Sequence, residues 1–199
     1  MWLFSCLATE IIKQVASLEI IMFYIPHFQY HIAEWADKKE EILSSLYTKH
    51  KTVTECNEGD TMHSSYFEKT DYSEFQPFLN MVSPYLKQMS VEILEKSYSQ
   101  KPIDEISRIW FQIQKQYEFH SLHNHGPDGW SAVFYADYDS QEHESTKFYC
   151  PMTTVDGLLY TFQPGVQEGD LVIFPAQINH ESVVNRSEKS RTIISFNMR

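Results

Sequence analysis

The sequence predicts a mainly β protein with α elements, in which a helical N-terminal layer packs on a C-terminal jelly-roll barrel. Gly59 is the only glycine before position 126, and the other five lie between positions 126 and 169. Apolar residues recur at helical spacing in the first part, whereas short runs of Val, Ile, Tyr, Phe and Trp broken by turn residues fill the second. We therefore expect one integrated domain, with the helical layer over residues 1–102 and the barrel over residues 103–199.

Three helices are expected in the N-terminal part. The first lies within residues 1–21, where apolar residues recur at Leu3, Leu7, Ile11, Val15 and Leu18. Charged residues interrupt this stretch, so it is neither a signal peptide nor a membrane span, and Met22 is a second possible start of the domain. Residues 29–50 and 73–98 show the same helical spacing, with Pro77 and Pro84 expected near a helix start or at a kink.

Seven strands are expected in the C-terminal part, at the near-regular spacing that is typical of a sandwich or barrel. They cover residues 106–123, 130–139, 145–151, 158–164, 169–176, 181–185 and 191–198. Each is a run of β-branched and aromatic residues bounded by Gly, Pro, Asp or Asn.

Composition excludes several function classes. The formal net charge of −11 disfavours a nucleic-acid partner held through phosphate contacts. The three cysteines, Cys6, Cys56 and Cys150, are odd in number and widely spaced, so we expect neither a disulfide framework nor a zinc-thiolate site. A reducing cytoplasm suits this chain best, and a homodimer through the helices is possible.

Histidines mark the first candidate site. His120, His123 and His125 lie within six positions. Alternate side chains of a strand face the same side, so His123 and His125 would project together, as a metal clamp or a paired hydrogen-bonding site. His180 follows the buried strand in GDLVIFP, and a barrel that brings these segments together would complete a set of three ligands. We expect His120 to lie behind this set or on the surface.

Arg191 is the second informative residue. In the last strand, Arg191, Ile193, Ser195 and Asn197 share one face. An arginine that faces the apolar interior of a barrel is costly unless it meets an anion, and its planar fork suits a carboxylate.

The stretches IWFQI, HNHGPDGWSAVFYAD, GDLVIFPAQINH and RTIISFN resemble the iron(II)- and 2-oxoglutarate-dependent oxygenases, in particular a subgroup of small 2OG-Fe(II) oxygenases of bacteria and phages. The resemblance covers residues 103–199. It implies a double-stranded β-helix fold and makes His123 and His180 ligands of Fe(II). It also implies that Arg191 binds the distal carboxylate of 2-oxoglutarate, and it makes Tyr135, Ser195, Asn197 and Gln112 candidate contacts of this cosubstrate.

The third metal ligand departs from the pattern of the superfamily. Most members have H-x-D or H-x-E, whereas this chain has His125 at the last position of the motif. Either three histidines hold the iron, or His125 is the first ligand and a carboxylate such as Asp128 is the third. We favour three histidines, because Asp128 would not share the face of His125 in a strand. Gln112 and Ile193 also depart from the subgroup, which tends to have Asn and Ser there.

The resemblance implies a dioxygenase that couples decarboxylation of 2-oxoglutarate, to succinate and carbon dioxide, to hydroxylation of a small molecule or a protein side chain. Trp110, Trp130 and Phe174 are candidates for the apolar wall of its site. One alternative is a cupin-like metal-binding protein, or a three-histidine dioxygenase that needs no 2-oxoglutarate. Another is a barrel that binds a partner without catalysis. Arg191 distinguishes the 2-oxoglutarate-dependent dioxygenase from both alternatives, because only a cosubstrate that carries a carboxylate requires this arginine.

Overall fold

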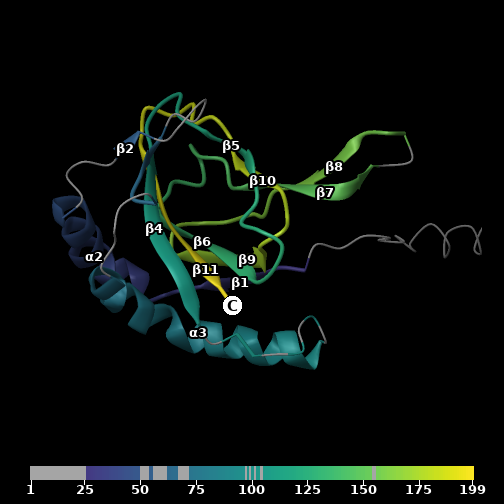
Figure 1. Ribbon diagram of the computed structural model, residues 1–199. Helices are drawn as coiled ribbons and strands as arrows, with labels where there is room; N and C mark the ends of the chain where they lie inside the picture. Colours follow the sequence, from purple (N-terminus) through teal and green to yellow (C-terminus); the bar gives the residue numbers. More distant parts are fainter. Residues whose placement is uncertain are drawn as a thin grey trace, which may run out of the picture.

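The structure is a computed structural model that describes residues 26–49, 54–55, 62–66, 72–96, 98, 100, 102–103, 105–153 and 156–199. Two antiparallel sheets face each other in a jelly-roll barrel, and two helices flank one side (Figure 1). The predicted fold class is therefore confirmed. Our expectations for residues 1–21, Met22, Cys6 and Cys56 fall outside the described residues.

The larger sheet has seven strands among the described residues, in the order β1-β9-β6-β11-β4-β3-β2. Their bounds are β1 Phe28–His31, β9 Asp170–Pro175, β6 Trp130–Asp137, β11 Arg191–Met198, β4 Ile106–Gln114, β3 His63–Ser64 and β2 Thr54–Glu55. The smaller sheet has the order β5-β10-β7-β8, with β5 His120–His123, β10 His180–Ser182, β7 Lys147–Thr153 and β8 Leu159–Phe162. The β7–β8 hairpin projects beyond the barrel (Figure 1).

The larger sheet buries both faces, and strand alternation gives each face its own core. The outer core contains Phe111, Phe134, Ile194 and their alternating neighbours on the same strands. The inner core, inside the barrel, includes Val133 and Ile193. Because every second residue of β4, β6 and β11 faces inward, these three strands can place polar side chains in the barrel.

The outer core is closed by α2 Trp35–Lys49, the 3-10 turn η1 Tyr72–Phe75 and α3 Gln76–Glu95. Trp35 anchors α2: its ring packs edge-on against Phe134, and its indole N–H donates to the Ala136 carbonyl over 2.9 Å. Pro77 occupies the first turn of α3, as predicted, whereas Pro84 lies inside this helix.

Several boundaries differ from the sequence prediction, and two of the differences change which element a segment forms. Residues 29–31, predicted at the start of a helix, belong to strand β1, because the backbone pairs with β9 from Phe28 opposite Ile173 to His31 opposite Asp170. Tertiary pairing overrides local propensity here. The predicted strand 106–123 is two strands in different sheets, and Tyr117, with a φ of 67°, lies in the turn between them. The N-terminal part therefore supplies strands as well as helices.

No helix among the described residues is long and apolar enough to cross a membrane. Cys150 is a free thiol buried in the inner core, and burial raises its pKa. It is a small core residue, as the sequence analysis expected.

Gly129 provides a test of the turn that leads into β6. It has a φ of +86°, and a Cβ atom there would lie 2.4 Å from the Met198 carbonyl oxygen. We expect Gly129→Ala to lower the free energy of unfolding by about 2 kcal/mol, since both the clash and the backbone strain oppose it. Gly165→Ala is the control, because a Cβ atom there meets nothing within 4 Å. Urea denaturation of both variants measures the difference; equal stabilities would contradict this account of the turn.

Candidate metal and cosubstrate site

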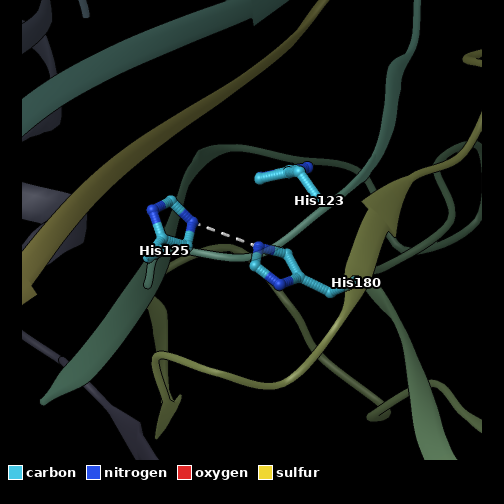
Figure 2. A group of neighbouring side chains, drawn as sticks. All are labelled: His123, His125 and His180. Carbon is cyan, nitrogen blue, oxygen red and sulfur yellow. Dashed lines mark hydrogen bonds between the residues drawn. The ribbon is translucent and has the colours of Figure 1, made fainter. Parts of the chain in front are cut away.

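Three histidines converge inside the barrel from adjacent strands of the smaller sheet. His123 ends β5, His180 begins β10 opposite it, and His125 follows β5 by two residues. One nitrogen from each lies within 4.8 Å of the others, and the Nε2 atoms of His125 and His180 are 3.3 Å apart (Figure 2). Two nitrogens bound to one ion at about 2.1 Å lie at most about 4.2 Å apart, so small shifts would bring all three onto a metal.

Backbone carbonyls orient two of these rings. Nδ1–H of His123 donates to the Ser121 carbonyl over 2.7 Å, and Nδ1–H of His180 donates to the Ile178 carbonyl over 2.9 Å. A histidine whose Nδ1 carries the proton presents the lone pair of Nε2. Both rings are therefore held in the tautomer that a metal ligand requires.

The barrel interior keeps His125 and His180 neutral. Burial, together with the nearby His123 and His120, lowers the pKa of His125 to about 3. Burial also lowers the pKa of His180, and His123 and His125 add to this effect. Neutral imidazole is the form that binds metals, so protons compete weakly at neutral pH.

His120 is closer to the cluster than its sequence position suggested. Its ring stacks on His123 with 3.8 Å between centroids, and its Nδ1 accepts a hydrogen bond from the amide of Gln112 over 3.3 Å. Gln112 comes from β4 in the larger sheet. His120 and Gln112 therefore connect the His123 side of the cluster to the opposite wall of the barrel.

The space around the cluster is a narrow cavity of about 20 Å³, which has room for about one water molecule. It is lined by residues of both sheets: Trp110, Gln112, His120, His123, His125, Val133, Thr146, His180, Ser182, Ile193 and Ser195. No carboxylate is among these described residues.

Arg191 lies on the inward face of β11, two residues before the cavity-lining Ile193. Its side chain is 3% exposed, and Nη1 donates to the Glu144 carbonyl. The other two nitrogens, Nε and Nη2, are buried and have no hydrogen-bond partner among the described residues. Burial lowers the pKa of Arg191, while Tyr135, Tyr138 and Glu144 oppose this shift. A buried cation with two unsatisfied donors is costly unless an anion joins it.

Tyr135 connects the surroundings of Arg191 to the cavity. Its hydroxyl donates to Thr146 Oγ1 and accepts the Thr146 backbone N–H, each over 3.1 Å. Burial raises the pKa of Tyr135, so the hydroxyl stays protonated. Thr146 itself lines the cavity from the loop before β7, whereas the sequence analysis placed it in the predicted strand 145–151 and gave it no role.

The remaining candidates lie in different places. Ser195 lines the cavity, whereas the side chain of Asn197 accepts a hydrogen bond from Ser131 over 2.9 Å outside it. Asp128 is exposed and lines a separate surface pocket with Gln177. Phe174 packs against His180 with 4.8 Å between ring centroids, in keeping with an apolar wall. Trp130 packs in the outer core, so the prediction that it forms part of the apolar wall of the site is wrong.

The low histidine pKa values predict an acid-sensitive fold. Between about pH 3 and 6.5 the unfolded chain binds a proton at His125 that the folded chain does not bind, so stability rises with pH there and levels off above pH 6.5. We expect His125→Gln to remove about 1 kcal/mol per pH unit of this slope. Urea denaturation of the metal-free proteins between pH 5 and 8 measures it; identical slopes below pH 6.5 would contradict the burial of a neutral His125.

Comparison with known proteins agrees with this geometry. Residues 108–197 match the model of a family described as "Putative 2OG-Fe(II) oxygenase". This stretch runs from β4 to β11 and includes the histidine cluster and Arg191. No curated protein shows a significant sequence match to the chain.

Solved structures share the fold at low sequence identity. A Pseudomonas putida prolyl-4-hydroxylase superposes with a TM-score of 0.57 and 15% identity, over 94% of this chain and 96% of the other. The α-ketoglutarate-dependent epimerase SnoN of nogalamycin biosynthesis superposes with a TM-score of 0.63 and 11% identity, over 88% and 78%. A Trichoplax adhaerens prolyl hydroxylase gives 0.55 and 11%, over 96% and 88%. Over residues 108–197, which include most of the barrel, the chain is therefore similar to this family of 2OG-Fe(II) oxygenases.

Proposed function

We propose that the protein is an Fe(II)- and 2-oxoglutarate-dependent dioxygenase in which His123, His125 and His180 hold the iron and Arg191 binds the distal carboxylate of the cosubstrate. One observation carries the proposal. A barrel that matches the model of this family contains a cluster of three histidines and, in the other sheet, a buried arginine with two unsatisfied donors.

The histidine cluster suits a divalent transition metal. Three imidazole nitrogens on one side of an ion leave its other positions open, as oxygenase chemistry needs. The carbonyls of Ser121 and Ile178 support the ring orientations of His123 and His180. Asp128, the alternative third ligand, lines a different pocket, which favours the three-histidine set.

The surroundings of Arg191 suit a carboxylate. Its Nε and Nη2 atoms can form a fork that binds both oxygens of one carboxylate. Tyr135 remains protonated beside it and can add a neutral donor if its bond to Thr146 is exchanged. Because the cavity has room for about one water molecule, cosubstrate binding requires it to widen toward Arg191, past Thr146 and Ile193.

With iron and 2-oxoglutarate bound, dioxygen would be the oxidant: one oxygen atom would enter the substrate as a hydroxyl group and the other would enter succinate, as 2-oxoglutarate is oxidised and loses carbon dioxide. The chain's own part is to bind, orient and exclude water. Phe174 and Trp110 form apolar walls beside His180 and His125, with ring centroids 4.8 Å and 5.5 Å apart. Such walls strengthen the electrostatic contacts within the site and limit side reactions.

A three-histidine cupin-like dioxygenase that needs no 2-oxoglutarate is the second candidate, because the histidine cluster alone fits it equally well. Arg191 weighs against it, since that function leaves the guanidinium without an anion.

The choice of ligands can be tested by metal titration. We expect His125→Ala to weaken Fe(II) binding by more than about 100-fold under anaerobic conditions, because it removes a direct ligand. Asp128→Asn is the matched control and should keep wild-type affinity, because its side chain is exposed in another pocket. The reverse result would replace the three-histidine set by one that contains the Asp128 carboxylate.

The cosubstrate can be tested through the visible charge-transfer band that 2-oxoglutarate gives when it chelates Fe(II). In an anaerobic titration, wild type should develop the band, and Arg191→Met should need about 100-fold more 2-oxoglutarate while its Fe(II) affinity is unchanged. Wild-type protein that binds Fe(II) but shows no band, and releases no succinate in air, would favour the cupin-like alternative.

A further inference from the structure

Unsatisfied hydrogen-bond donors gather on one wall of the barrel. Among the described residues, five buried side-chain polar atoms have no hydrogen-bond partner. Four of these are N–H donors: Trp110 Nε1, Gln114 Nε2, and Nε and Nη2 of Arg191. All four belong to β4 and β11, which are paired neighbours in the larger sheet. Buried donors without partners are rare in folded proteins, and a ligand is one of the explanations for them.

The sheet register places Gln114 beside Arg191. The two residues are direct partners in the antiparallel pairing of β4 with β11. Side chains opposite each other in such a pair have Cβ atoms about 5 Å apart. Gln114 also shares the inward face of β4 with Gln112 and Trp110, both of which line the cavity. The Gln114 amide and the Arg191 guanidinium therefore lie on the same wall at the same level of the barrel.

Only one of the two polar atoms of the Gln114 side-chain amide has a hydrogen-bond partner. Its Oε1 accepts a hydrogen bond from the Ser182 hydroxyl over 2.7 Å, which fixes the side chain to β10. Its Nε2 is the atom without a partner, and the residue is 3% exposed. An amide held in this way beside a cation carries donors but no free negative charge, so it would add to anion binding and not compete with it.

Trp110 holds the corresponding position at the metal end of the wall. It is the direct partner of Ser195 in the pairing of β4 with β11. The pair of Gln112 with Ile193 lies between this pair and the pair of Gln114 with Arg191. Its ring lies 5.5 Å from that of His125, and it is 2% exposed. Indole N–H is a donor only, so it requires an acceptor inside the barrel.

We propose that Gln114 is a further cosubstrate-binding residue that shares the distal carboxylate of 2-oxoglutarate with Arg191, and that the Trp110 indole donates to the oxygens at the metal-binding end. The inference rests on the proposed function. An acceptor-rich dianion that spans the wall would satisfy all four donors, whereas Arg191 alone would leave two buried N–H groups unpaired.

The test separates the two ends of the ligand. Protein loaded with Fe(II) under anaerobic conditions is titrated with 2-oxoglutarate and with 2-oxopentanoate, which keeps the chelating end but has a methyl group in place of the distal carboxylate. Gln114→Leu should weaken 2-oxoglutarate about 10- to 100-fold and leave 2-oxopentanoate unchanged. Trp110→Phe, which keeps the ring but lacks the N–H group, should weaken both ligands by the same factor.

Two further variants keep the result interpretable. Gln116→Leu is the matched control, because the Gln116 side chain donates to the Arg186 carbonyl outside the barrel and should not affect either ligand. Gln114→Glu is nearly isosteric, and its carboxylate would pair with Arg191 and exclude 2-oxoglutarate. A cooperative melting transition and an Fe(II) affinity at the wild-type value show that each variant is folded, although Gln114→Leu is expected to melt earlier because it removes the acceptor of the Ser182 hydroxyl.

The outcomes are distinguishable. If wild type binds 2-oxoglutarate and both Gln114 variants bind it equally well, the role of Gln114 is wrong while the proposed function stands. Equal weakening of both ligands in Gln114→Leu would also overturn it, because the distal carboxylate would not be the group affected. If wild type binds Fe(II) but not 2-oxoglutarate, the proposed function itself fails.

Discussion

The constraint on which the site depends is that the central strands of the larger sheet bury both of their faces. On β11, Ile194 and Phe196 face the helices, which forces Arg191, Ile193 and Ser195 into the barrel. A shift of one residue in register would exchange the two sets and move a cation into an apolar helix–sheet core. The packing of α2 and α3 on the outer core therefore holds the register that places Arg191 inside.

Much of this arrangement could be predicted from sequence, because it follows from local alternation. The parity of residues 191–197 placed Arg191 inward, and the spacing of His123, His125 and His180 indicated one metal cluster. The structure brings these three histidines together, as the sequence analysis expected. Strand alternation has a period of two, so it can be counted along a single stretch of chain without knowing the rest of the fold.

Features that depend on pairing between distant strands could not be predicted in this way. Strand β1 forms at residues predicted as helix because β9 is available to pair with it. Gln114 received no role because its significance comes from lying opposite Arg191, 77 positions later in the chain. Trp130 was placed in the wrong wall because a run of aromatics does not reveal which of them faces the helices.

The barrel interior differs in charge from the chain as a whole. The protein carries a formal net charge of −11, yet no carboxylate is among the described residues that line the cavity. Burial keeps His125 and His180 of the cluster neutral. The wall formed by β4 and β11 carries one buried cation, Arg191, and four unsatisfied nitrogen donors, of which two belong to Arg191 and one each to Trp110 and Gln114. A divalent metal on neutral ligands keeps its full charge, which in a low-dielectric cavity favours a dianionic chelator. In the proposed site, a carboxylate among the ligands would reduce this attraction, so a histidine at position 125 and the donors of β4 and β11 would both favour the dianion.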